Sequence, residues 1–143
     1  MEDPLKAKSR FKNGYACSQS VLSTLAPDLG LDEETALKVA SAFGGGMARH
    51  GEVCGALTGA LMVMGLKFGS LNTGEEEAVR TASQELMRRF EAENGSLLCR
   101  ELLGYTLIVP EELEKARQSG VFQTRCPLFV QSATELAKEI INA

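Results

Sequence analysis

The sequence predicts an all-α fold: a single domain over residues 1–143, built as a bundle of about five to seven helices. Apolar residues recur at spacings of three and four along most of the chain, which is the period of a helix with one buried face. Runs of alternating apolar and polar residues, which indicate strands, are missing. Of the 143 residues, 44% are hydrophobic and 24% are charged, as expected for one globular domain with its own core.

The first two helices are delimited by residues that disfavour helix continuation. The first helix is expected over about residues 3–25, and Pro27 and Gly30 then interrupt its apolar pattern. The second is expected to begin at Asp32, whose carboxylate can accept hydrogen bonds from the free amides of the first turn. The three glycines at 44–46 end it.

The third helix is expected from Gly51 or Glu52 to about Phe68, and it contains several glycines. Gly51, Gly55 and Gly59 are four residues apart, so they share one helical face. A glycine inside a helix costs about 1 kcal/mol relative to alanine, and the repetition therefore needs an offsetting reason. Close packing of another helix is the simpler interpretation, and close approach of a cofactor is the alternative.

The second half of the chain predicts three further helices and a shorter one. An amphipathic helix is expected over about residues 74–93, a shorter helix ends at Gly104, and another begins at Pro110. The last helix begins at Cys126 and continues almost to the C-terminus. Residues 105–109 favour an extended conformation, but a single run without a partner strand cannot form a sheet.

Composition and charge exclude several classes of protein. The net charge is −4, so the chain has no overall attraction to phosphate backbones and no nucleic-acid partner is expected. The longest apolar stretch without charge, residues 53–66, is shorter than the roughly 18 residues of a membrane span. Residues 1–4 include two acidic side chains and lead into no apolar run, so we expect no secretory signal and a reducing, cytoplasmic location.

The four cysteines, Cys17, Cys54, Cys99 and Cys126, are too few for a disulfide-stapled secreted domain. No two of them form a Cys-x-x-Cys pair, which argues against a zinc finger and against a thioredoxin-type active site. Residues on different helices of a bundle can still meet in its core. The cysteines are therefore candidates for one common site.

Two of these cysteines are expected at helix starts. Cys54 lies in the expected first turn of the third helix and Cys126 at the start of the last one, where free amides and the helix dipole stabilise a thiolate. Gly14 is expected on the same helical face as Cys17, where it would leave space beside the sulfur. Inert core packing is the simplest interpretation of one buried cysteine. The two helix starts favour a shared redox or metal site.

The turn before the third helix contains further candidates for a binding role. Gly44, Gly45 and Gly46 would let the backbone approach a bound group, and His50, the one histidine of the chain, could shuttle a proton or act as a ligand. An exposed loop histidine is the simpler interpretation. Arg49 is equally able to hold an anion. The turn lacks a Gly-Lys-Ser/Thr ending and follows a helix, so nucleotide binding is not expected.

Several blocks of sequence together resemble a known family. They are Gly14-Tyr15-Ala16-Cys17-Ser18-Gln19-Ser20-Val21-Leu22, Phe43-Gly44-Gly45-Gly46-Met47 and Cys54-Gly55-Ala56-Leu57-Thr58-Gly59-Ala60, followed by Cys99 and Cys126. With these blocks, nearly the whole chain resembles the redox-active protein family labelled by the pattern C-GCAxxG-C-C. The label writes Gly-Cys-Ala where this chain has Cys54-Gly55-Ala56, so that block is matched by its cysteine, its small residues and Gly59.

The resemblance implies a small helical protein, found mainly in anaerobic bacteria and archaea, whose cysteines do redox work. The family sometimes occurs beside electron-transfer modules, and related domains next to haem proteins suggest an iron–sulfur cluster as one cofactor. The resemblance supplies no substrate. It implies that the site is centred on the cysteines.

Three functional hypotheses remain open at this point. In the first, the protein is an oxidoreductase or electron carrier with an unknown redox partner protein. Cys54 and Cys126 then supply thiols of low pKa, and Cys17 and Cys99 act as resolving partners or further ligands. In the second, the cysteines hold an iron–sulfur cluster. In the third, a non-catalytic helical module binds structural zinc or only packs its cysteines. We also allow for a homodimer in each of these hypotheses.

The candidate cofactor contacts of the second hypothesis lie in the glycine-rich segments. They are Gly44, Gly45, Gly46, His50, Gly55 and Gly59.

Overall fold

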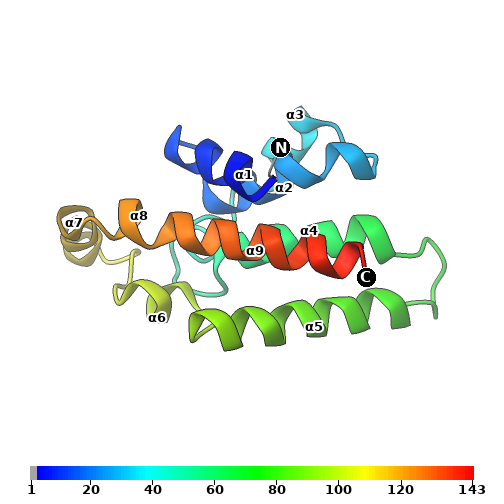
Figure 1. Cartoon of the computed structure of the whole chain (residues 1–143). Coiled ribbons are helices and arrows are strands. Elements are labelled where there is room, and N and C mark those ends of the chain that lie inside the picture. The colour runs from blue at the N-terminus through cyan, green and yellow to red at the C-terminus, as the bar shows by residue number, and fades with distance from the viewer. Residues whose placement is uncertain (1–2) are drawn as a thin grey trace.

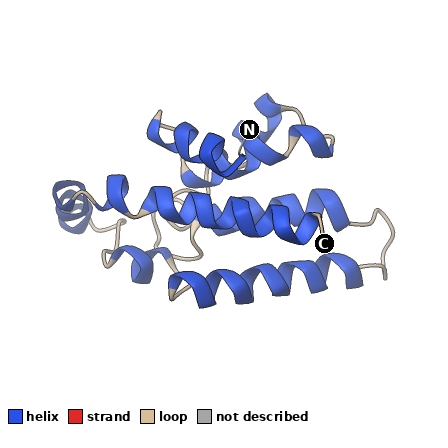
Figure 2. Cartoon of the chain, in the orientation of Figure 1, coloured by secondary structure: helices blue, strands red, loops and turns tan. Residues whose placement is uncertain are grey.

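The computed structural model describes residues 3–143, and all its regular elements are helices (Figure 2). The helices are α1 (Asp3–Lys12), α2 (Cys17–Leu25), the 3-10 helix η1 (Pro27–Leu29), α3 (Glu33–Val39), α4 (Gly55–Phe68), α5 (Glu77–Asn94), α6 (Cys99–Leu103), α7 (Pro110–Ser119), α8 (Val121–Thr124) and α9 (Cys126–Ile141). Seven α-helices have seven or more residues, and α6 and α8 are shorter. The predicted all-α class is confirmed, although the two short helices raise the total above the expected range.

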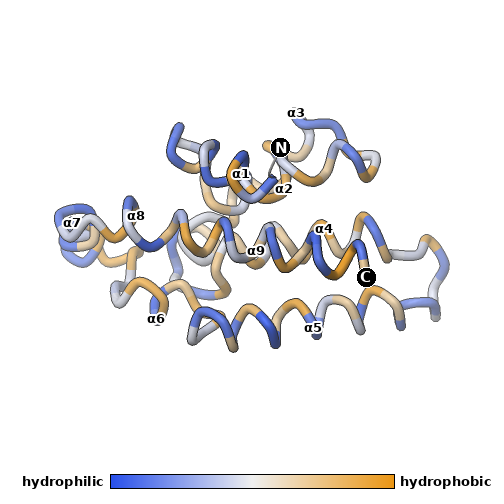
Figure 3. Tube along the Cα trace, viewed as in Figure 1, coloured by the Kyte–Doolittle hydropathy of each residue, from blue (hydrophilic) through white to orange (hydrophobic). Residues whose placement is uncertain are grey.

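Three helices lie side by side and form the centre of the molecule. α9 packs against both α4 and α5, while α1 and α2 cover the other side of α4 and α9 (Figure 1). α6, α7 and α8 gather at one end of this bundle. Figure 3 shows that α4 is largely hydrophobic along its length, as a central helix requires, whereas α7 is mostly hydrophilic.

The buried side chains form two clusters of unequal size. The larger cluster joins α1 to α5 with α9 and includes Leu57 and Phe90, both with no exposed surface. The smaller cluster contains Leu103, Leu107 and neighbouring residues of α6 to α8. Phe129 of α9 packs against both clusters, and its ring centroid lies 6.5 Å from that of Phe90. The two clusters therefore share one wall.

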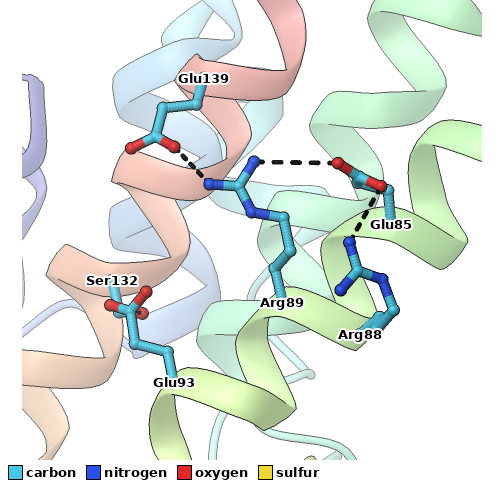
Figure 4. Close-up of polar contacts among 6 residues, drawn as sticks. All are labelled: Glu85, Arg88, Arg89, Glu93, Ser132 and Glu139. Carbon is cyan, nitrogen blue, oxygen red and sulfur yellow. Dashed lines mark hydrogen bonds and ion pairs between the residues drawn. The ribbon is translucent and has the colours of Figure 1, made fainter.

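Polar contacts fix α5 against α9 along the outside of the bundle (Figure 4). Arg89 of α5 forms an ion pair with Glu139 of α9 and lies 4.0 Å from Glu85 one turn earlier on its own helix. Ser132 of α9 donates a hydrogen bond of 3.0 Å to a carboxylate oxygen of Glu93. These groups are mostly half-exposed, so they orient the helices more than they stabilise the fold.

The expected first helix is two helices, separated by residues 13–16. Gly14 has a φ of +108°, a backbone conformation that ends α1 and that few other residues adopt. The prediction that Gly14 shares a helical face with Cys17 is therefore wrong. A Cβ atom at Gly14 would meet no atom within 4 Å, so this glycine serves the turn and not the space beside the sulfur.

The remaining boundaries agree with the sequence except at three places. The second expected helix, α3, ends at Val39 and not at the glycines 44–46, since residues 40–42 already form a turn. Asp32 caps α3, since its carboxylate accepts a 3.0 Å hydrogen bond from the amide of Thr35. The third expected helix begins only at Gly55, because the chain before it is held in a left-handed turn. α8 was not expected, and α9 follows it almost directly through Arg125, whose backbone is helical. In the described residues, strand pairing is limited to an isolated bridge between Val53 and Leu98, and residues 105–109 form bends and a turn.

Candidate functional site

All four cysteines line one cavity with a volume of about 650 Å³. Cys17 is the first residue of α2, Cys54 is the N-cap of α4, Cys99 is the first residue of α6, and Cys126 is the first residue of α9. Each is a free thiol. Four segments that are distant in the sequence thus bring four sulfur atoms to one place.

The cavity lies where the two hydrophobic clusters meet. Phe129 contributes to both clusters and to the cavity wall, and Cys54 and Cys99 belong to the larger and the smaller cluster, respectively. Among residues 3–143, Arg49 and Arg117 are the charged side chains that line it, and no carboxylate does. The surroundings of the sulfurs are therefore apolar, and their few charges are positive.

Burial raises the pKa of every thiol in this site. It raises the pKa of Cys17, raises that of Cys54 well above its usual range and raises that of Cys99 to about 12, because the apolar surroundings disfavour a thiolate. Burial also raises the pKa of Cys126. The proximity of the sulfurs adds to the effect, because a thiolate at Cys17 raises the pKa of each of the other three.

The prediction of low-pKa thiols at Cys54 and Cys126 is therefore wrong for the metal-free chain. Cys54 is an N-cap and not a first-turn residue, and the amides of Ala56 and Leu57 do lower its pKa, but by less than burial raises it. At Cys126 burial is again the largest effect and only the residue's own amide lowers the pKa, because Pro127 has no N–H and the amide of Leu128 donates to the carbonyl of Arg125 at 2.9 Å. A helix start favours a thiolate only where its amides are free and the sulfur is hydrated.

Cys17 has the most backbone donors around its sulfur. Amides of Gly45, Ser18 and Ala56, together with its own, each favour the anionic sulfur and offset part of the effect of burial on its pKa. These amides come from three segments of the chain: α2, α4 and the loop between α3 and α4. Cys17 is the position in the site that is best prepared to carry negative charge.

The glycine-rich loop is a short left-handed helical turn. Five successive residues have φ between +52° and +71°: Gly45, Gly46, Met47, Ala48 and Arg49. Left-handed helical backbone costs about 1–2 kcal/mol for each residue with a Cβ, so three of these residues are strained. Amides of the loop and of Glu52 donate to carbonyls within the segment, for example Gly51 to Gly45 at 3.1 Å, which holds the conformation.

The glycines explain how the sulfurs fit. A Cβ atom at Gly55 would collide with Sγ of Cys17 and lie 2.9 Å from the carbonyl oxygen of Phe43. A Cβ at Gly46 would lie 2.8 Å from Cβ of Cys99. Gly59 does not line the cavity; a Cβ there would lie 2.7 Å from the carbonyl oxygen of Ser18, so that glycine serves the close packing of α2 on α4.

Two of the expected site residues, His50 and Gly46, do not line the cavity. His50 is exposed, does not line the cavity, and has Nδ1 3.2 Å from the carbonyl oxygen of Ala48 in its own loop. Gly46 is buried beside Cys99 and also does not line the cavity, whereas Gly44, Gly45 and Gly55 do.

The sequence alone did not identify one part of the cavity wall. It consists of Leu103, Leu107, Leu113, Arg117 and Phe122, which come from α6 to α8 and the turn between α6 and α7. These residues have no local motif. Their one signal is apolar spacing in short helices, which indicates burial but not what they face.

The donor set fits a soft metal centre better than a single hard ion. Thiolates select zinc, copper(I) or iron–sulfur clusters, whereas carboxylates and carbonyls suit calcium and magnesium. In residues 3–143, no three side chains of the His, Cys, Asp or Glu type lie close enough together to share one metal ion.

The helices and the cavity define the class: a small all-α protein with one four-cysteine site. A sequence model of the family described as "Putative redox-active protein (C_GCAxxG_C_C)" matches residues 15–140, and the chain belongs to this family. No curated protein and no solved structure matched the chain. Within the described residues, no helix is both long enough and apolar enough to cross a membrane.

Proposed function

We propose that the protein is an electron-transfer protein in which Cys17, Cys54, Cys99 and Cys126 hold an iron–sulfur cluster. The observation that carries the proposal is that four free thiols from four distant segments line a single apolar cavity. Iron–sulfur clusters in proteins are held by cysteine thiolates, most often four of them. The number and kind of donors on this cavity agree with that requirement.

Thiol–disulfide exchange is less well supported by the same site. Exchange begins when a thiolate attacks a disulfide sulfur, so its rate depends on the fraction of thiolate. Burial raises the pKa of all four thiols, which leaves little thiolate at neutral pH. A bound metal centre removes this obstacle, because its positive charge draws the protons from its thiol ligands.

Structural zinc is also less well supported. A structural zinc site needs four ligands in a tight tetrahedron, with zinc–sulfur distances of about 2.3 Å. Among the described residues, no three of these side chains meet that requirement. A cluster of several iron and sulfide ions spans a larger space, so more widely separated sulfurs can hold it.

In this proposal the chain's own residues tune the centre. The amides of Gly45, Ser18 and Ala56 favour negative charge on the Cys17 sulfur, and such hydrogen bonds raise the reduction potential of a cluster. The apolar wall lowers the polarity around the sulfurs, and Gly55 leaves the space that the Cys17 sulfur needs. The cluster itself would supply one-electron exchange with a redox partner protein.

The test is anaerobic purification followed by an absorption spectrum and measurement of iron and acid-labile sulfide. The expected result is coloured protein with stoichiometric iron and sulfide. Each of C17S, C54S, C99S and C126S should lose most of the iron or bind a spectroscopically altered cluster. V121T is the matched control, because Val121 is also buried in the smaller cluster but does not line the cavity. Colourless, iron-free protein after reconstitution, or equal loss of iron in V121T, would contradict the proposal.

A further inference from the structure

The cavity is larger than the cysteines alone require. Its volume of about 650 Å³ lies within the range of roughly 300–1,000 Å³ that is usual for small-molecule sites. Beyond the sulfurs, it continues along an apolar wall that includes Leu107, Leu113 and Phe122. Such a wall supplies no ligand atom to a metal centre, but it fits the apolar body of a small organic molecule.

The charges on the cavity have the opposite sign to the chain as a whole. The net charge is −4, yet the charged side chains that line the cavity within residues 3–143 are two arginines. Arg117 has only a long contact of 4.0 Å to Glu114, and both side chains are more than half exposed. Arg49 has no ion pair with any described residue. Both guanidinium groups are therefore free to bind an anion.

The loop backbone determines the place of Arg49. Its φ is +68°, in a strained left-handed turn that packing and hydrogen bonds maintain. A Cβ atom at Gly45 would lie 3.0 Å from both Cα and Cγ of Arg49, so the glycine lets the arginine stem lie directly on the loop. The strained left-handed turn thus holds Arg49 at the cavity.

We infer that this cavity binds a small organic molecule with an apolar body and one anionic group, a carboxylate or a phosphate. The apolar body lies on the wall formed by Leu107, Leu113 and Phe122, and Arg49 and Arg117 bind the anionic group. This inference goes beyond the proposed function, because binding requires neither iron nor a redox step. It places a ligand of defined chemistry next to the four sulfurs.

A pair of fluorescent probes tests the inference on the full-length protein as purified. 1-Anilinonaphthalene-8-sulfonate has an apolar body and one anionic group, and N-phenyl-1-naphthylamine has nearly the same body without the charge. The sulfonate should bind at one saturable site per chain. R49Q and R117Q should each weaken its binding about three- to tenfold and leave the uncharged probe nearly unchanged. L113A should weaken both probes.

R88Q is the matched control, because Arg88 is an exposed arginine on α5 and does not line the cavity. Octanoate or phenyl phosphate should displace the sulfonate probe, and octanol at the same concentration should displace it less. The inference is overturned if the sulfonate shows no saturable binding, if R49Q and R117Q weaken it no more than R88Q does, or if neither anion displaces it.

Iron and sulfide measured on the same samples separate this inference from the proposed function. Probe binding that depends on the arginines, in protein that stays iron-free after reconstitution, supports the ligand site and contradicts only the cluster. Variants that shift the absorption spectrum of a bound cluster but bind the probe normally overturn the ligand site, since the arginines would then act only on the metal centre.

Discussion

Replacement of Gly55 by alanine tests whether the site depends on close approach of α4 to Cys17. The added methyl group would collide with the Cys17 sulfur and lie 2.9 Å from a backbone oxygen of Phe43, and a carbonyl cannot move without shifting its loop. Gly65→Ala is the matched control, because Gly65 is in the same helix and a Cβ there meets no atom within 4 Å. The same substitution thus adds a methyl group at a crowded position and at an open position of one helix.

The two variants should change stability in opposite directions. An alanine at Gly65 gains about 1 kcal/mol from helix propensity, since that position is exposed and inside the helix. Gly55 is the first residue of α4, where propensity matters less, and overpacking a well-packed site costs about 1–3 kcal/mol. For a chain of this length the two melting temperatures should differ by about 5–15 °C.

Thermal and urea unfolding, followed by circular dichroism, measure this difference, and iron content is measured on the same preparations. G55A should be less stable and should bind less iron than either G65A or the parent protein. If G55A is as stable as G65A and retains its iron, the contact between α4 and Cys17 does not explain the glycine, and the described geometry of the site is wrong.

Four further predictions follow from single features. Phe90→Ala should lower the free energy of unfolding by about 3–5 kcal/mol in urea titrations, because the ring is fully buried, whereas Leu71→Ala, at a fully exposed position, should change it little. Ala48→Gly should raise it by up to about 1 kcal/mol, since alanine is strained at a φ of +52°; an unchanged or lower value would mean that the turn is not strained. Asp32→Ala should lower the melting temperature at neutral pH, and Asp32→Asn should largely preserve it. Because hydrogen bonds from Thr35 lower the pKa of Asp32, the parent protein should lose this stabilisation as pH falls through the carboxyl range. Equal melting temperatures of D32A and the parent protein would refute the cap. In metal-free protein, the buried thiols keep their protons to higher pH than in the unfolded chain, where the pKa of a thiol is about 9. Since the pKa of Cys99 is about 12, the free energy of unfolding should fall as pH rises from 9 toward 12. A free energy of unfolding that stays constant in that window would contradict the burial of the thiols.

Local signals in the sequence predicted most helix boundaries correctly. Asp32 caps α3, Pro110 begins α7, and Gly104 ends α6 with a φ of +81°. Each of these residues acts through its own backbone or through an amide a few positions away, so the neighbouring sequence contains the whole cause.

Features that depend on tertiary contacts could not be predicted in this way. The turn at Gly14 and the left-handed conformation of Met47 and Arg49 are maintained by hydrogen bonds and packing, and residues with a Cβ atom give no warning of such a conformation. The predicted direction of the pKa shift was wrong at Cys54 and Cys126 for the same reason. A helix start can be recognised in the sequence, but the burial that outweighs it at Cys54 comes from the whole fold.

The position of the cavity between two hydrophobic clusters of unequal size has a dynamic consequence. The free energy of local opening follows the number of buried contacts, and the smaller cluster has only five buried residues, all within 99–121. This segment should therefore exchange its amide hydrogens at lower cost than the helices of the larger cluster. The part of the cavity wall that this segment forms should thus open before the rest of the bundle, which would widen the access of a bulky group to the sulfurs.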